Sequence, residues 1–202
     1  VEPNDDMRRQ ALDESLDDPR ISYQKGHAEE LDFKRGSAFL ICAGQAVQWF
    51  DREAFYNQAH QLLVEGGVLA LFENNRDWRN SAFLEVHERF LEENSVRKDG
   101  RKYSRFYRDH PYAMELLRKF GSVHANQFRW VREMTIDAFI SMAASSTQVQ
   151  RAFERLGEEI GVAKIRAYCE EYANDEGVIE LPYVTELYMA RKVSISTLGT
   201  KT

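Results

Sequence analysis

Two apolar runs of strand length, separated by an amphipathic helix, constrain this chain more than any other feature. The run GSAFLICAG, residues 36–44, carries no charge and is typical of a parallel strand covered on both faces. Apolar residues then recur at helical spacing from Phe55 to Leu63, behind Asp51 as N-cap. The stretch EGG is expected to end this helix, and the strand VLALFEN follows. This order predicts a doubly wound α/β sheet with right-handed crossovers.

The residues before this unit extend the same rhythm. The chain opens with VEP, which is typical of the end of a buried strand, and Asn4 or Asp5 then caps a helix. The stretch ISYQKG, residues 21–26, alternates as a short strand. The first third is therefore predicted as strand, helix, strand, strand, helix, strand.

The rest of the chain is predicted to mix helices and strands. Helices are expected at 81–94, 111–121 and 135–146 and from 148 to 172, where Gly157 and Gly161 bend or split the helix, and strands at 122–135 and 178–193. Pro182 favours an edge or a bulge at the start of the last strand. The tail 194–202 carries no structural signal and is expected to be disordered.

Charge and cysteine content narrow the classes of partner. The 202 residues carry a formal net charge of −6, which argues against a general binder of nucleic-acid backbones. Two cysteines exclude a disulfide scaffold, and the five histidines lack metal-ligand spacing, so we expect no metal. No apolar run approaches the roughly 20 residues of a membrane span. Small molecules or proteins are the expected partners, with no nucleic acid and no membrane, in the cytoplasm.

A basic and aromatic stretch, RKDGRKYSRFYRDH, invites a different interpretation. Arginines and aromatic rings suit phosphate and base contacts. A solvated loop or a lid is favoured here, because the chain is acidic and the stretch links two helices. The residues concerned are Arg97, Lys98, Arg101, Lys102, Tyr103, Arg105, Phe106, Tyr107 and Arg108.

Ligands of open α/β sheets bind beyond the carboxyl ends of the strands. Glu2 lies at such an end, and a carboxylate there can accept hydrogen bonds from both vicinal hydroxyls of a ribose. A solvated acid, or a partner for the dipole of the helix that follows, is the alternative. No P-loop, G-x-S-x-G or G-x-G-x-x-G motif is present.

Five segments in order, VEPNDDMRRQA, ISYQKGHAEEL, FLICAGQAVQWFD, LLVEGGVLALFENNR and VTELYMARK, resemble the class I S-adenosylmethionine (SAM)-dependent methyltransferases, and among them the small-molecule branch. The resemblance implies a Rossmann-like, mostly parallel sheet with an inserted helical cap, and SAM as cofactor with S-adenosylhomocysteine as product. It divides the chain into an N-terminally incomplete SAM-binding core at 1–76, an acceptor-binding cap at 77–122, and the rest of the core at 123–193. The family's first strand and its glycine-rich motif would lie before Val1.

The resemblance also assigns binding residues. Glu2 would bind the ribose, Pro3 and Met7 would lie along the adenosine, and the loop after the third strand would flank the adenine. The segment after the fourth strand would line the methionine moiety. The loop residues are Gly26, His27, Ala28 and Glu29, and those after the fourth strand are Ala43, Gly44, Gln45, Gln48 and Trp49.

The catalytic residues stay unknown at this level. Gln48 stands where the branch usually has a histidine, and an amide cannot act as a general base. Tyr103, Tyr107, His110 and Glu73 are the remaining candidates for a general base.

The expected function is methyl transfer to a small molecule. The alternative is a non-catalytic or truncated methyltransferase-like module that binds or oligomerises, with a homodimer expected. Another nucleotide-binding Rossmann protein is weaker, because AGQAVQWF has no role there.

Overall fold

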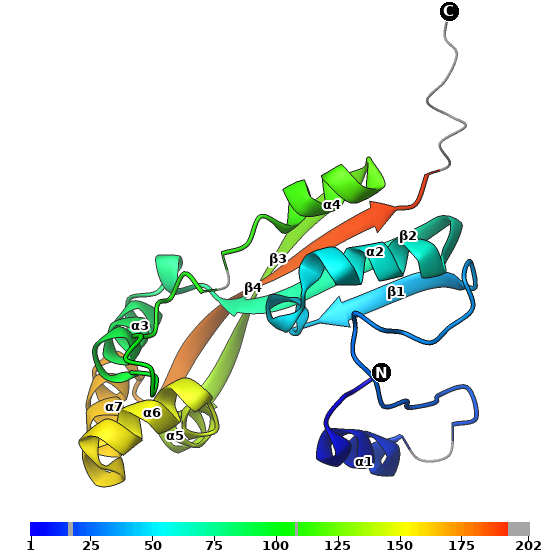
Figure 1. Ribbon diagram of the computed structural model, residues 1–202. Helices are drawn as coiled ribbons and strands as arrows, with labels where there is room; N and C mark the ends of the chain where they lie inside the picture. Colours follow the sequence, from blue (N-terminus) through cyan, green and yellow to red (C-terminus); the bar gives the residue numbers. More distant parts are fainter. Residues whose placement is uncertain (16–17, 108, 194–202) are drawn as a thin grey trace, which may run out of the picture. The chain divides into compact units, whose positions relative to one another are not determined.

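The computed structural model describes residues 1–15, 18–107 and 109–193. The predicted tail 194–202 lies outside the described residues. Over that part of the chain a four-stranded sheet forms with strand order β1-β2-β4-β3 (Figure 1). The strands are β1 (Ala38–Gly44), β2 (Leu63–Arg76), β3 (Val123–Thr135) and β4 (Val178–Arg191). The predicted α/β class is confirmed.

Helices occupy most of the predicted positions. They are α1 (Asp5–Glu14), α2 (Arg52–Leu62), α3 (Ala82–Asn94), α4 (Tyr112–Phe120), α5 (Ile136–Ala144), α6 (Thr147–Leu156) and α7 (Glu158–Tyr172), with short 3-10 turns η1 (Val47–Trp49) and η2 (Trp78–Asn80). Side chains cap the helix starts as expected: Asn4 accepts from the backbone N–H groups of Asp6 and Met7. The predicted split at Gly157 is confirmed, since its φ of 85° separates α6 from α7.

The chain divides into two compact units, which we describe separately. Unit 1 comprises Val1–Phe72, Pro111–Asn126 and the chain from Leu187, and unit 2 comprises Glu73–His110 and Gln127–Glu186. The core, cap and C-terminal boundaries expected from the sequence stay a prediction.

Unit 1 is built on the parallel pair of β1 and β2, which run side by side from Leu40↔Val68 to Gly44↔Phe72. β4 runs against β2, because Gly66 and Gly67 exchange backbone hydrogen bonds with Lys192, while Asp77 donates to Pro182. The predicted parallel arrangement therefore holds for the β1–β2 pair. The prediction that Pro182 marks an edge strand is wrong, because β4 lies between β2 and β3; the Pro182 carbonyl accepts the Asp77 N–H just past the end of β2.

The prediction that residues 36–44 are covered on both faces is wrong. Helices α2 and α4 pack on the face that carries Ala43, Leu69 and Leu71, all of them buried. On the edge and the other face, the exposed fractions of Phe39 and Leu40 are 78% and 58%. Because β1 pairs only with β2, one side of this apolar strand has no neighbour among the described residues.

Two other local expectations fail. Residues 21–26 form no strand, and neither does the VEP stretch: a single backbone hydrogen bond, from Glu2 N–H to the Gln24 carbonyl, joins the two. A strand needs a ladder of such bonds. The EGG stretch does not end α2 but lies inside β2, where Gly66 takes a φ of 79° and the register against β1 shifts.

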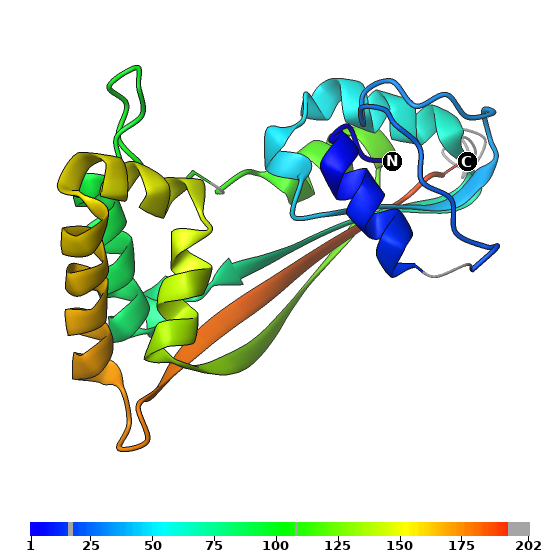
Figure 2. The same ribbon diagram turned by 90° about the horizontal axis from the view of Figure 1, so that it is seen from below.

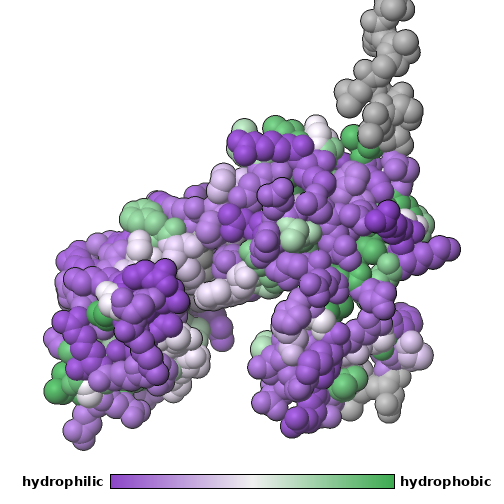
Figure 3. Space-filling view, in the orientation of Figure 1, coloured by the Kyte–Doolittle hydropathy of each residue, from purple (hydrophilic) through white to green (hydrophobic). Residues whose placement is uncertain are grey.

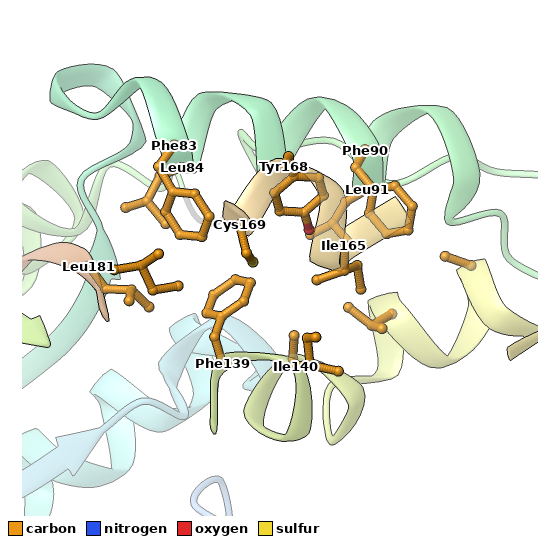
Figure 4. Close-up of a cluster of buried hydrophobic side chains, with 14 of the residues drawn as sticks. Phe83, Leu84, Phe90, Leu91, Phe139, Ile140, Ile165, Tyr168, Cys169 and Leu181 are labelled. Atoms are coloured by element: carbon orange, nitrogen blue, oxygen red, sulfur yellow. The ribbon is translucent and has the colours of Figure 1, made fainter. Parts of the chain in front are cut away.

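Unit 2 gathers four helices around its own core. Figures 1 and 2 show α3, α5, α6 and α7 grouped together. Figure 4 shows their apolar side chains pointing toward one another, with Phe139 of α5 directed toward Cys169 of α7 and Phe83 of α3. Phe83 and Phe139 meet edge to face, with ring centroids 5.0 Å apart. Elsewhere the visible surface is mostly hydrophilic with scattered apolar patches (Figure 3).

Gly161 provides a test of this core. A Cβ at this position would lie 2.3 Å from the ring of Phe153, which is 6% exposed. Gly161→Ala gains about 1 kcal/mol of helix propensity, but overpacking costs about 1–3 kcal/mol. We expect a net loss in the free energy of unfolding, measured by urea denaturation. Lys164→Ala, on the exposed face of α7, is the matched control and should stay within about 0.5 kcal/mol of the parent. Stabilisation by Gly161→Ala would contradict this packing.

Candidate functional site

The carboxyl end of β1 turns sharply beside the carboxyl end of β2. Gly44 leaves room for the Phe72 ring, since a Cβ there would lie 2.4 Å from it. Gln45 takes a φ of 53°, a left-handed conformation that costs energy for a residue other than glycine. Its backbone N–H donates to the Phe72 carbonyl at 3.1 Å, which fixes the turn. Two of the predicted residues thus form a tight, strained loop where ligands of α/β sheets bind.

The 3-10 turn η1 continues this loop. Val47 is buried and anchors it, while the Trp49 ring is 73% exposed. The side-chain Nε2 of Gln48 donates to the Gln45 carbonyl at 3.2 Å. Its Oε1 is buried and has no hydrogen-bond partner among the described residues. A buried amide oxygen without a donor is costly, and it suits a ligand that brings an N–H group.

The loop at residues 26–29 lies against the same region. The Glu29 carboxylate accepts the backbone N–H of Asp51, the N-cap of α2, at 2.9 Å. Ala28 packs against the apolar cluster of unit 1, and the His27 carbonyl accepts from Glu30 N–H. The structure therefore brings this loop and the segment after β1 together.

The predicted N-terminal residues form a separate group. Gly26 touches Val1, whose Cγ1 would lie 3.1 Å from a Cβ at Gly26. One carboxylate oxygen of Glu2 accepts the Asn4 N–H at 2.8 Å. Pro3 is exposed, and the Met7 side chain is 60% exposed. Glu2 and Gly26 are thus neighbours, whereas the side chain of Met7 extends into solvent.

The candidate bases all lie in unit 2. The Tyr103 hydroxyl donates to the Glu88 carboxylate at 2.7 Å, and burial raises the pKa of Tyr103 well above its usual range. This phenol therefore stays protonated near neutral pH. Glu73 is buried at 2% exposure, and His110 is half-buried. The Tyr107 ring lies tilted against the Tyr103 ring.

A buried polar network holds the end of β2 in unit 2. Arg76 forms an ion pair with Glu88 at 2.9 Å and contacts His87 Nε2 at 3.2 Å. The other ring nitrogen of His87 lies 2.7 Å from the Tyr168 hydroxyl. Because the guanidinium can only donate, Nε2 accepts, and the imidazole is neutral with its proton on Nδ1. Burial and the Arg76 charge hold the pKa of His87 well below its usual value.

Sequence reasoning missed this network, although a signal was present. His87 and Glu88 stand three and four residues after Leu84, on the apolar stripe that continues at Leu91. Polar residues on a buried helix face must find partners there.

The basic stretch is held mostly by internal pairing. Arg105 pairs with Glu92 at 2.7 Å, and Arg101 pairs with Asp99 at 2.6 Å. The guanidiniums of Arg105 and Arg79 lie 4.8 and 4.4 Å from the centroid of the Trp78 ring. These contacts favour the loop interpretation made from the sequence; Arg108 lies outside the described residues.

No group of three or more His, Cys, Asp or Glu side chains is placed to hold a metal ion within the described residues. Nor does any helix in that part of the chain have the length and apolar character needed to cross a membrane.

His87 generates a pH prediction. The folded pKa lies below the unfolded value of about 6.5, so its contribution to stability is full above pH 6.5 and is lost as the pH falls. Below that value the unfolded chain binds a proton that the folded chain does not. We expect the unfolding free energy to fall by about 1.4 kcal/mol per pH unit more in the parent than in His87→Gln between pH 6 and 5. Urea denaturation measures both slopes, and equal slopes would contradict a neutral buried imidazole.

Comparison with known sequences identifies similar proteins. Residues 1–71 match a family described as methyltransferase domain. A protein of Dictyostelium discoideum assigned as a methyltransferase is 36% identical over 52 residues. This match covers 26% of the present chain and 20% of that protein, so it spans about a fifth of the relative.

Solved structures share the fold. A protein from Anaeromyxobacter dehalogenans assigned as a type II methyltransferase has a TM-score of 0.68 at 21% identity, covering 95% of this chain and 78% of its own. One from Anabaena variabilis ATCC 29413, assigned as a methyltransferase of an antibiotic biosynthesis pathway, gives 0.58 at 16%, covering 93% and 79%. A third, from Bacillus halodurans C-125 and assigned as a methyltransferase, gives 0.53 at 16%, covering 96% and 81%.

Proposed function

The chain has the fold of the class I SAM-dependent methyltransferases, and its residues 1–71 match the methyltransferase domain; from this premise we propose that the protein transfers a methyl group from SAM to a small-molecule acceptor. The observation that carries the proposal is the loop at the carboxyl end of β1. There a strained turn at Gln45 and a buried, unpaired amide oxygen of Gln48 adjoin an exposed Trp49 ring.

The residues of unit 1 fit a ligand with the parts of SAM. Gln48 Oε1 suits an ammonium group, which brings the donors that this oxygen lacks among the described residues. One carboxylate oxygen of Glu2 accepts the Asn4 N–H, and the other is left to accept hydrogen bonds from ribose hydroxyls, which carboxylates bind well. The loop that carries Ala28 and Glu29 is fixed to the start of α2, so it offers a rigid wall for a flat base. When bound, SAM supplies a methyl group on a sulfonium, which is a strong electrophile.

The chemical demands on this chain are modest. Displacement at a sulfonium methyl requires an in-line approach, and good alignment of two reactants recovers on the order of 7–11 kcal/mol. A base is needed only if the acceptor loses a proton during transfer. Gln48 cannot serve as one, and Tyr103 holds its proton toward Glu88. Orientation and exclusion of water are therefore the contribution that we assign to this chain.

Glu2 is the residue to test. We expect Glu2→Ala and Glu2→Gln to weaken SAM binding at least about tenfold in titration calorimetry, since a charge-assisted hydrogen bond is worth about 1.5–3 kcal/mol. Glu2→Gln keeps an oxygen for the Asn4 N–H and so separates cofactor binding from local folding. Asp13→Ala, an exposed acid on α1, is the matched control and should bind as the parent does. Unchanged affinity in both Glu2 variants would remove Glu2 from the site.

A second candidate, an oligomerisation module, is favoured by one observation. β1 is an edge strand without a charge or a proline, and its Phe39 and Leu40 side chains are exposed. Proteins usually protect such edges because they pair with other chains.

Sedimentation velocity tests the association. On this second candidate we expect the 202-residue chain to form dimers at micromolar concentration, and Leu40→Lys to shift them to monomers by placing a charge at the edge. Lys34→Ala, an exposed residue before β1, is the control and should leave the dimer unchanged. A parent that stays monomeric would exclude association through this edge.

A further inference from the structure

A cavity of about 310 Å³ in unit 2 has no part in the proposed function. Its walls come from the start of α3 at residues 81–83, from the end of α7 and the turn after it at residues 172–174, and from Val178 and Glu180 of β4. All of these residues belong to unit 2. The volume lies at the lower end of the range for small-molecule sites, about 300–1,000 Å³.

Two aromatic rings line this cavity. Phe83 is 4% exposed and Tyr172 is half-buried, and their ring centroids lie 6.0 Å apart at an interplanar angle of 58°. The Phe83 ring also packs edge to face on Phe139 in the helical core (Figure 4), which holds it in place. Val178 adds an aliphatic side chain. The cavity therefore offers an apolar surface to the body of a small ligand.

Hydrogen bonds fix two of the walls. The side-chain oxygen of Asn174 accepts the backbone N–H groups of Glu176 and Val178 at 3.0 and 2.9 Å, and the Asn174 N–H donates to the Val178 carbonyl at 2.9 Å. On the α3 side, the Ser81 hydroxyl oxygen accepts the Leu84 N–H at 3.2 Å. Walls that are formed before binding lose little entropy when a ligand enters.

Glu180 is the one charged residue among the described residues that line the cavity. It forms no ion pair with any residue that the structure describes. Asp175 and Glu176 lie in the exposed turn that leads into β4, and the sequence from 167 to 190 contains no lysine or arginine. This wall of the cavity is therefore negatively charged.

The positive charges of neighbouring segments are directed to other partners. Arg79, just before α3, forms an ion pair with Asp109 at 3.0 Å. Arg129 of β3 pairs with Asp77 at 3.4 Å. The exposed Arg132 lies on the same strand, which contributes no residue to the cavity. The charge that the cavity presents to a ligand is thus negative.

We propose that this cavity binds an organic cation, a primary ammonium group attached to a small aromatic or apolar body. The ammonium donates to the Glu180 carboxylate, and charge-assisted hydrogen bonds are stronger than neutral ones. The rings of Phe83 and Tyr172 attract the same positive charge and pack against the apolar body. The dipole at the start of α3 favours an anion instead, so an anion is the competing occupant. The site lies within unit 2 and goes beyond the proposed function, since it involves none of the residues assigned to SAM.

Three probes that share a phenyl ring separate these occupants. At pH 7, 2-phenylethylamine carries an ammonium group, as lysine does, whereas 2-phenylethanol is neutral and 3-phenylpropionate is an anion. The methyl groups of Ala82, Ala173 and Val178 line the cavity and report binding in ¹H–¹³C spectra of the full chain. We expect the amine to shift these resonances saturably. Because Glu180 is exposed and an exposed ion pair is weak, the alcohol should bind about threefold to fivefold more weakly, and the propionate more weakly still.

Variants connect the shifts to the cavity. Glu180→Gln keeps the shape of the side chain but removes its charge, so amine binding should weaken about threefold to fivefold and become equal to alcohol binding. Tyr172→Leu removes one ring and should weaken the amine and the alcohol together. Glu176→Gln removes an exposed acid that does not line the cavity and is the matched control, with unchanged binding.

Four results would overturn the proposal: methyl resonances of the cavity that the amine leaves unmoved, equal affinity for amine and alcohol, propionate binding as tight as that of the amine, or full amine binding in folded Glu180→Gln. An equal loss in Glu176→Gln would reduce the effect to diffuse attraction by the acidic segment and would also overturn it. None of these titrations contains SAM, so their failure is distinguishable from a failure of SAM binding in calorimetry.

Discussion

The length of three strands sets the organisation of this protein. β2 and β4 have 14 residues each and β3 has 13, whereas a typical strand has about 5–6. A single layer of short helices cannot cover such strands. The chain therefore builds two apolar clusters, and β4 contributes to both, with Leu181 buried in unit 2 and Ala190 buried in unit 1.

In unit 1 the consequence is a loop with stored strain. Parallel pairing brings the ends of β1 and β2 to the same edge, where Gly44 lies against Phe72 and Gln45 adopts a left-handed conformation. Strain of this kind persists only where surrounding contacts hold it, and it gathers at binding sites. The side-chain oxygen of Gln48, which has no hydrogen-bond partner among the described residues, supports the same proposal that this loop binds a ligand. A buried acceptor without a donor is rare in a folded protein.

In unit 2 the same strands carry polar groups into a helical core. Arg76 ends β2 and is held by Glu88 and His87 of α3. Such a buried network stabilises a unique arrangement only when all members are paired, and removing one partner leaves a buried charge. On β3 and β4, the Thr185 hydroxyl accepts the indole N–H of Trp130 and so fixes the orientation of that ring. The helical unit thus offers rigid surfaces rather than a flexible cover.

The sequence alone determined the α/β class and most helix boundaries, because caps, glycines and apolar spacing act locally, as at Asn4 and Gly157. It did not determine coverage. The apolar run 36–44 suggested two buried faces, and only the strand order showed Phe39 and Leu40 exposed. The glycines at 66 and 67 read as a helix end, yet a register shift against β1 uses them as a bulge. Likewise His87, Glu88 and Trp130 acquired partners from residues 11 to 81 positions away. Pairing and burial depend on contacts between distant segments, which local patterns do not encode, so only the tertiary structure decided them.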